Sequence, residues 1–372
     1  MLQKLIFKPG INHEQTRYAA DGGWFDCDKI RFRSGLPEKI GGWTAYSGVV
    51  PDGVPRSLFN FVALDGSNYM SVGTTLRYYI EEGGALYNIT PIRRTSSLGS
   101  NPITTGSAGS GVVSIADSGH GAVINDFVTL SGATTTDGVT AAQLNTTHQV
   151  VTVTSAGVYT IDTGGAASSG STAGGGASVE AQYEINTGLD VGVSGTGWGT
   201  STWGRLTWGS SASTELDDSD QLRLWSQDSF GEDLIFCARD GGVYYWDKSD
   251  GTGARAVALS SESGALDVPT VARQVMISNN DRHVLAFGCN DRGATTQDKL
   301  LIRWSDQENA VDWTPTTTNT AGDVRLNNGS EIITAHETRQ EILVWTDATL
   351  NSLRFVGPPF TFGQNVIDAN TS

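Results

Sequence analysis

The sequence is poor in cysteine and in long apolar stretches. Cys27, Cys237 and Cys289 are its three cysteines, too few and too far apart for a disulfide scaffold or a zinc knuckle. Each lies in an apolar or alternating run, which is typical of packed, reduced thiols in a chain made in a reducing cytoplasm. No run of about 18 apolar residues occurs, and the N-terminus lacks the apolar core and the cleavage site of a signal peptide. The expectation is a protein with neither a disulfide framework nor a membrane span.

Basic charge is scarce as well. The chain has 24 Lys and Arg against 40 Asp and Glu, which gives a net charge of −16. A nucleic-acid-binding surface is basic, so this excess of acid excludes attraction of phosphates to the surface as a whole. Two acidic clusters, Glu81-Glu82 and Asp217-Asp218-Ser219-Asp220, are interpreted as solvated turns. The second offers carboxylates for Ca²⁺ but lacks the Gly and the distal Glu of an EF-hand loop, so no metal site is predicted.

Catalytic motifs are also missing from the sequence. Its five histidines are scattered and form no HExxH motif. No nucleophile elbow, P-loop or dinucleotide-binding fingerprint stands between a strand and a helix. Two carboxylates could hydrolyse a glycan, but an acidic chain always offers such pairs, so this test is weak. The sequence predicts a protein that is not an enzyme and has no cofactor, with a polysaccharide-degrading enzyme as a remaining alternative.

Glycine and short aromatic runs are abundant instead. The chain has 46 Gly and ten Trp, a composition that suits many short strands joined by tight turns. No stretch longer than about ten residues shows helical spacing of apolar residues. The segment WGTSTWGRLTWG, with Trp198, Trp203 and Trp208, could bind sugars, but packing of its large aromatic side chains is the favoured interpretation. The sequence predicts an all-β fold.

The strand-like runs recur in sets. Three sets cover residues 69–73, 76–80 and 85–91; residues 222–226, 233–237 and 242–247; and residues 283–288, 300–305 and 310–315; a fourth begins with 341–345 and 352–356. Trp246 and Trp313, each near the end of a set, are 67 positions apart, which is interpreted as one repeat. Short strands with a late aromatic residue are typical of propeller blades. We therefore expect a β-propeller-like core of short antiparallel sheets, with a β-sandwich as the alternative.

An insertion of different composition interrupts the sets. Thr, Ser, Gly and Ala dominate residues 96–184, which contain the Gly-rich segments 107–111 and 164–176. The strands expected between these segments are 112–115, 127–130, 149–153 and 158–161. This pattern predicts a small inserted β-barrel or sandwich between flexible flanks. The expected domains are an N-terminal arm with the first propeller-like strands (1–95), the inserted module (96–184) and further blades (185–372).

The N-terminal region carries the most distinctive motif, GGWFDCDKIRFRSGLPEKIGGW, at residues 22–43. Alternation over Cys27–Arg33 predicts a half-buried strand, and residues 34–37 supply the turn after it. Together with the preceding MLQKLIFKPGIN, these residues resemble the opening of the tail nozzle (tail hub) proteins of short-tailed, podovirus-type bacteriophages. In the insertion, His120-Gly121 followed by DFVTLSG at residues 126–132 resembles a small β module of phage tail proteins.

The resemblance implies a structural virion protein of the phage tail, made in the cytoplasm of the host bacterium. Such a subunit forms a homohexameric ring that conducts DNA during ejection without binding it specifically, with an acidic lumen that repels the DNA backbone. It docks to the adaptor, or head-to-tail connector, and to a needle, fibre or spike. The residues expected at a subunit or partner interface are Trp24, Asp26, Asp28, Lys29, Arg31, Arg33 and Trp43. The alternative is a host-attachment protein that binds carbohydrate.

Overall fold

The computed structural model describes residues 8–14, 16, 18–19, 22–42, 44–45, 48–186 and 224–369. The chain divides into two compact units, Met1–Gly48 and Val49–Ser372. The predicted all-β class is confirmed, because the described residues form a hairpin in the first unit and many strands in the second, and their one α-helix, α1 (Ala141–Leu144), is four residues long. In the described residues, no helix has the length and apolar character to cross a membrane.

The described residues of the first unit form one β-hairpin, from β1 (Ile30–Arg33) and β2 (Leu36–Lys39). Ser34 and Gly35 form its two-residue turn with φ angles of 50° and 80°, the left-handed backbone that such hairpins require. The strand begins at Ile30 rather than at the expected Cys27. Lys29 has a φ of 56°, so the backbone before Ile30 is not extended.

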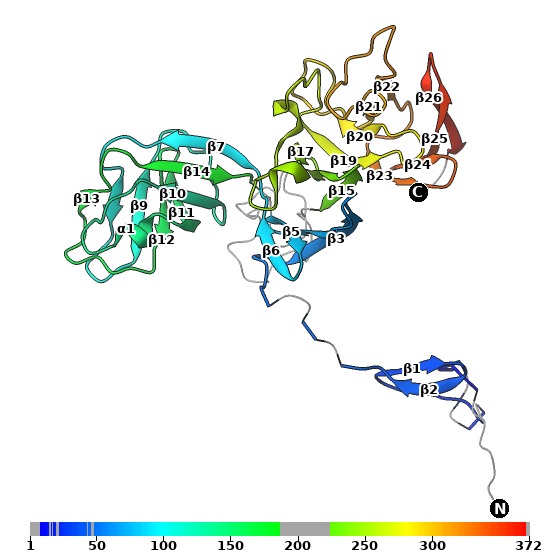
Figure 1. Cartoon of the computed structure of the whole chain (residues 1–372), viewed down its shortest axis with the longest axis horizontal. Helices are drawn as coiled ribbons and strands as arrows, with labels where there is room; N and C mark the ends of the chain where they lie inside the picture. Colours follow the sequence, from blue (N-terminus) through cyan, green and yellow to red (C-terminus); the bar gives the residue numbers. More distant parts are fainter. Residues whose placement is uncertain are drawn as a thin grey trace, which may run out of the picture. The chain divides into compact units, whose positions relative to one another are not determined.

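Besides the sheet of the insertion, the described residues of the second unit form four antiparallel sheets of four strands each, and in each of these four the strands follow in chain order (Figure 1). The first sheet has β3 (Pro55–Val62), β4 (Asn68–Thr74), β5 (Tyr78–Glu82) and β6 (Ala85–Asn88). The second has β15 (Trp225–Phe230), β16 (Asp233–Ala238), β17 (Val243–Trp246) and β18 (Val257–Ala258). The third has β19 (Ala272–Ile277), β20 (Val284–Cys289), β21 (Leu301–Trp304) and β22 (Gly322–Arg325). The fourth has β23 (Ile332–Glu337), β24 (Ile342–Thr346), β25 (Leu350–Gly357) and β26 (Thr361–Asp368). Two 3-10 helices, Lys248–Asp250 and Leu259–Ser261, flank β18.

Apolar clusters join consecutive sheets face to face. Phe61 and Tyr78 of the first sheet pack with Phe236 of the second in one cluster, and the Tyr78 and Phe236 rings stack at 4.0 Å. Two further clusters join the second sheet to the third and the third to the fourth. In the part of the chain that the structure describes, no cluster joins the fourth sheet to the first. This arrangement is propeller-like, because each sheet buries its faces against its neighbours.

The repeat length expected from the tryptophans is wrong. Trp246 lies in β17, the third strand of its sheet, whereas Trp313 is buried in a loop after β21, so the two positions are not equivalent. The segment 310–315, expected as a strand, belongs to this loop. The first strands of successive sheets start at Trp225, Ala272 and Ile332, which are 47 and 60 positions apart. Loop lengths therefore vary between the sheets.

The insertion forms one eight-stranded antiparallel sheet in the order β13-β8-β9-β12-β11-β10-β14-β7. Its strands are β7 (Ile92–Ser97), β8 (Ile103–Thr105), β9 (Val112–Ala116), β10 (Phe127–Ser131), β11 (Thr147–Ser155), β12 (Val158–Asp162), β13 (Ala173–Gly174) and β14 (Glu180–Glu184). Four of them lie where strands were expected. The sheet encloses an apolar cluster of its own, to which Ile115, Tyr159 and Tyr183 contribute.

The Gly-rich segments of the insertion are not flexible hinges, contrary to expectation. The Asp137 carboxylate accepts hydrogen bonds from the backbone N–H groups of Ser169 (2.9 Å) and Gly170 (2.7 Å), and Ala173 pairs with Thr104. The insertion is instead connected through β7 and β14. These strands pair with each other from Ile92 opposite Glu184 to Ser97 opposite Glu180 (Figure 1). A paired ribbon restricts motion more than two Gly-rich linkers would. The three expected domain boundaries stay a prediction.

Candidate functional site

Six of the seven predicted interface residues lie in the described part of the first unit, in the hairpin or in the residues before it. The Trp24 ring is half-buried and lies 6.1 Å from the Phe32 ring. Arg31 and Arg33 are exposed, and the half-buried Phe32 lies between them in β1. Arg31 pairs with Glu38 across the hairpin at 3.2 Å. Lys29 and Asp28 are exposed and 3.8 Å apart, and Asp26 is also exposed. Trp43 lies outside the described residues.

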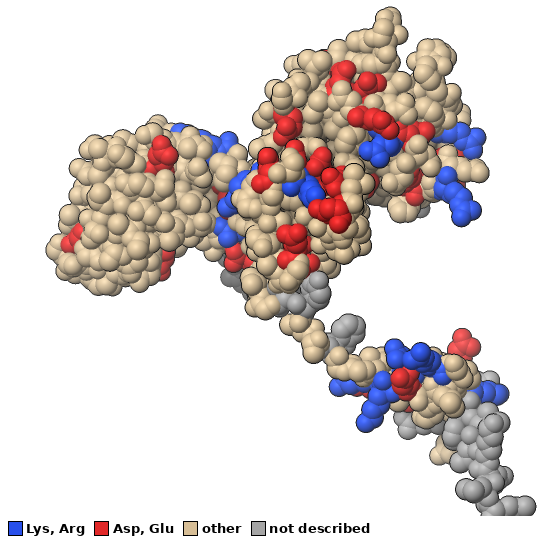
Figure 2. All heavy atoms as spheres, in the orientation of Figure 1, with Lys and Arg blue, Asp and Glu red and all other residues tan. Residues whose placement is uncertain are grey.

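This first unit differs from the rest of the chain in burial and in charge. None of its described residues is buried. Residues 1–48 contain seven Lys and Arg against five Asp and Glu, a net charge of +2, which leaves −18 for residues 49–372. Figure 2 shows basic side chains gathered on the hairpin and acidic ones spread over the second unit. A segment of this size without a core generally needs a partner to be stable.

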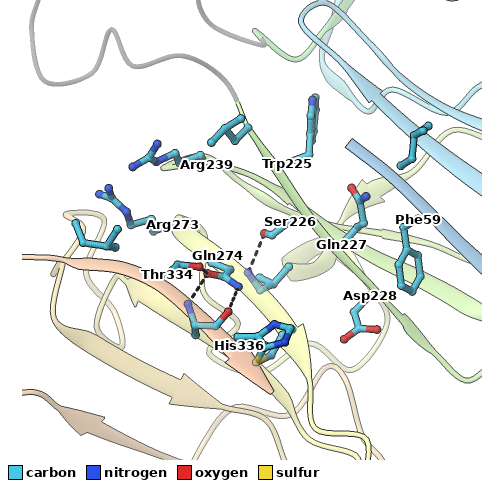
Figure 3. A pocket seen from close by; sticks show the side chains of 16 residues that line it. Phe59, Trp225, Ser226, Gln227, Asp228, Arg239, Arg273, Gln274, Thr334 and His336 are labelled. Carbon is cyan, nitrogen blue, oxygen red and sulfur yellow. Dashed lines mark hydrogen bonds between the residues drawn. The ribbon is translucent and has the colours of Figure 1, made fainter. Parts of the chain in front are cut away.

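A cavity of about 590 Å³ lies where the first strands of the four sheets meet (Figure 3). Its walls come from β3, β15, β19 and β23. They include Leu58, Phe59, Leu224, Trp225, Ser226, Gln227, Asp228, Arg239, Arg273, Gln274, Met276, Ile333, Thr334 and His336. The sequence did not indicate this site, because its residues come from four segments and no motif links them.

Side-chain hydrogen bonds link the strands around the cavity. The Ser226 hydroxyl and the Asp228 carboxylate of β15 accept from the backbone N–H groups of Val275 and Ile277 in β19, both at 2.9 Å. The side-chain amide of Gln274 in β19 donates to the Ala335 carbonyl (2.7 Å) and accepts from the Ala335 N–H (2.9 Å). Polar side chains thus replace the backbone hydrogen bonds that neighbouring sheets cannot share.

Charges line the cavity unevenly. Arg273 is buried, and its Nη1 lies 2.7 Å from a Glu331 carboxylate oxygen and 3.8 Å from one of Asp240. Burial and the neighbouring Arg273 lower the pKa of the Arg239 guanidinium. Burial raises the pKa of Asp228, which lies elsewhere on the wall. In Figure 3 the two guanidinium groups lie on one side and Asp228 lies on the other.

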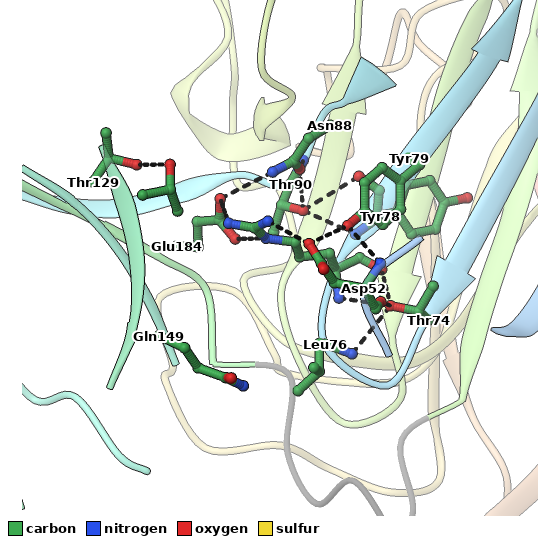
Figure 4. A network of polar contacts seen from close by, with 12 residues as sticks. Asp52, Thr74, Leu76, Tyr78, Tyr79, Asn88, Thr90, Thr129, Gln149 and Glu184 are labelled. Atoms are coloured by element: carbon green, nitrogen blue, oxygen red, sulfur yellow. Dashed lines mark hydrogen bonds and ion pairs between the residues drawn. The ribbon is translucent and has the colours of Figure 1, made fainter. Parts of the chain in front are cut away.

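A second polar cluster, the Glu184 network, lies where the insertion rejoins the sheets (Figure 4). The buried Glu184 carboxylate accepts two hydrogen bonds from Arg77 (2.8 and 3.2 Å), one from Arg255 (3.0 Å) and one from Asn88 (3.1 Å). Arg77 also donates to Asp52 at 2.6 Å. Burial acts to lower the pKa of Arg77, but Glu184 outweighs it, so that pKa is raised. The network is satisfied and structural.

Other candidate residues have structural surroundings. Cys237 and Cys289 are buried thiols, and burial raises the pKa of Cys289 to about 12, which makes it unreactive. His120 is buried; its Nδ1 accepts from the Ala122 N–H (2.9 Å) and its Nε2 lies 3.1 Å from the Ser155 carbonyl. Among the residues that the structure describes, no three His, Cys, Asp or Glu are grouped as a metal site would need. The acidic cluster at 217–220 and the Trp segment at 198–209 lie outside them.

The comparisons with known proteins identify no family. No protein-family model matches the chain, and no curated protein matches it. Among solved structures it is similar to the phage phi92 endosialidase, at 12% sequence identity and a TM-score of 0.24, over 86% of this chain and 44% of that chain. The chain thus spans under half the length of that protein. A likeness at this level carries no argument about fold or function.

Proposed function

We propose that the protein is a structural subunit of a phage tail, a nozzle or hub protein that forms a ring. The observation that carries the proposal is the first unit: it bears the motif that resembles nozzle proteins, yet none of its described residues is buried. The first unit has a net charge of +2, and residues 49–372 have a net charge of −18. The first unit is thus a basic arm without a core, and residues 49–372 form an acidic body. When copies assemble, the arm of one copy can bind the body of another, because their charges are opposite.

The ring would be homohexameric and would dock to the adaptor and to a needle, fibre or spike, as in the proteins that the motif resembles. DNA would pass through its lumen without specific binding, because the acidic bodies repel phosphates. No residue would turn over a substrate. The hairpin face with Arg31 and Arg33 is the part of the arm best suited to contact an acidic neighbour.

Light scattering of the purified chain tests this function. We expect a ring-sized assembly for the native chain and a shift to monomer for Arg33→Glu, because this exposed side chain then repels the acidic body. Arg354→Glu, a charge reversal at an exposed position of β25, is the matched control and should leave the assembly unchanged. A native chain that stays monomeric at all concentrations, or equal effects of the two variants, would argue against the ring.

The alternative function, host attachment through carbohydrate, rests on the cavity. Among the residues that line the cavity, Trp225 is the one tryptophan. Its ring packs against Tyr78, and its indole N–H donates to the Thr74 carbonyl at 2.7 Å. It therefore offers little stacking surface to a sugar. Glycan-array binding by the purified chain, if seen, would favour the alternative over the nozzle.

A further inference from the structure

We propose that the cavity between the four sheets binds a small organic anion, whose carboxylate or phosphate group lies against Arg239. This residue directly follows β16, and its backbone N–H donates to the Leu224 carbonyl at 2.8 Å, which fixes it beside the start of β15. Figure 3 shows its guanidinium on the same side of the cavity as that of Arg273. The proposal is independent of the tail function.

The hydrogen-bonding capacity of the two arginines is not used up. Arg273 has a side chain that is 3% exposed, and its Nε has no hydrogen-bond partner in the described part of the chain. Arg239 makes no ion pair within the same residues, whereas Arg273 has Glu331 and Asp240 nearby. Guanidinium groups bind carboxylates and phosphates through paired N–H donors. An oxyanion beside Arg239 would give that guanidinium an anionic partner.

Holding Arg239 in this place costs stability when the cavity has no anion. Burial and the like charge of Arg273 lower its pKa against the opposing attraction of Asp240 and Glu331, which means that the charged form is disfavoured there. Groups held in unfavourable electrostatic surroundings cluster at functional sites. An anion beside Arg239 would oppose this effect, because it would favour the charged form of that guanidinium.

The cavity sets the size and the character of the remainder of the ligand. Its volume of about 590 Å³ lies within the range of roughly 300–1,000 Å³ typical of small-molecule sites, and is far too small for a DNA duplex. Leu58 in β3, Leu224 just before β15 and Ile333 in β23 line it and are 64%, 41% and 43% exposed. Exposed apolar side chains at a cavity suit an apolar body on the ligand.

Isothermal titration with three probes of similar shape tests the proposal and separates the two anion sources. Benzoate carries a carboxylate, phenyl phosphate a phosphate, and benzamide no charge. We expect one saturable site per chain for at least one of the anions and none for benzamide. Stronger binding of benzoate would identify a carboxylate ligand, and stronger binding of phenyl phosphate a phosphate. If neither anion binds, or benzamide binds as well as they do, the proposal is wrong.

Variants connect the binding to the named residue. Arg239→Gln should weaken anion binding at least about tenfold, because a charged hydrogen bond is lost. Arg354→Gln, at an exposed position outside the cavity, should bind like the native chain. Without ligand, Arg239→Gln should melt at the native temperature or higher, since the repulsion by Arg273 is gone. A clear drop in its melting temperature, or equal losses of binding in both variants, would show that Arg239 is structural.

Discussion

At the scale of single residues, the charges that matter for stability are the few buried ones. Glu184 is at the end of the insertion, yet its partners lie elsewhere: Arg77 between β4 and β5, Asn88 at the end of β6, and Arg255 just before β18. It therefore ties the inserted sheet to the body through one side chain. Most other ion pairs are partly exposed, and pairs of that kind add little because water screens them.

Glu184→Gln should lower the free energy of unfolding by about 3 kcal/mol, because two guanidinium groups then lose the anion that compensates their burial. Urea unfolding followed by tryptophan fluorescence measures this. Glu308→Gln is the matched control: its pair with Arg282 is solvent-exposed, at 3.6 Å, and its loss should cost no more than about 1 kcal/mol. Equal effects of the two variants would contradict the role assigned to Glu184.

His283 should make stability depend on pH in a mildly acidic window. It is buried beside Phe355 and Phe362, and burial lowers its pKa against the opposing influence of Asp281 and Asp306. The neutral imidazole is therefore favoured in the folded state. Its stabilising contribution is present above the unfolded pKa of about 6.5 and is lost as the pH falls through the lower folded value.

Unfolding free energies at pH 7.5 and pH 5.5 test this prediction. The native chain should lose stability between the two, and His283→Gln should lose less. His336→Gln, which changes an exposed histidine, should behave like the native chain. Asp298 and Asp306 have lowered pKa values, so the stability that depends on them is lost at lower pH, below the range compared here. A native chain with no decline above pH 5.5 would contradict the assignment.

At the scale of elements, the first strands of the sheets depend on side chains for their links. Gln274→Ala should weaken the docking of β23 on β19, because both backbone groups of Ala335 lose their partner, at a cost of about 2 kcal/mol. Hydrogen exchange should then show faster exchange of the Ala335 amide. Gln364→Ala removes a single bond, to Asn351 at 2.9 Å, and should leave that amide protected. Unchanged protection in Gln274→Ala would mean that packing alone holds the fourth sheet.

These same strands explain what the sequence could and could not predict. β16 and β20 are buried almost throughout, so they appear in the sequence as continuous apolar runs, and both were predicted. β19 and β23 face the cavity and carry Arg273, Gln274 and His336, which interrupt the apolar pattern, and both were missed. The cavity could not be predicted for the same reason. Its residues come together only where four strands that are distant in the sequence meet, and a local sequence pattern gives no information about such contacts.

At the scale of the whole molecule, charge is divided between the two units. The net charge of −16 is the sum of +2 for the basic arm, residues 1–48, and −18 for the acidic body, residues 49–372. The difference matters for assembly, because an arm of opposite charge lowers the repulsion between acidic copies. In the proposed ring, the excess of acid on the bodies could then face the lumen.

The assembled ring should therefore not retain duplex DNA, even at low salt. Attraction to DNA comes mainly from Lys and Arg that displace counterions at phosphates, and in the proposed ring the basic arms are engaged with neighbouring bodies. Electrophoretic mobility of a DNA duplex with the purified assembly measures this. We expect no shift between about 50 and 200 mM salt, the range over which phosphate contacts show their salt dependence. Dissociated Arg33→Glu chains serve as the comparison. Tight binding that weakens steeply with salt would show that the protein binds DNA through its phosphates. A lumen lined by Lys and Arg in a structure of the assembly would show the same. Either result would contradict the proposed passage of DNA through the ring without binding.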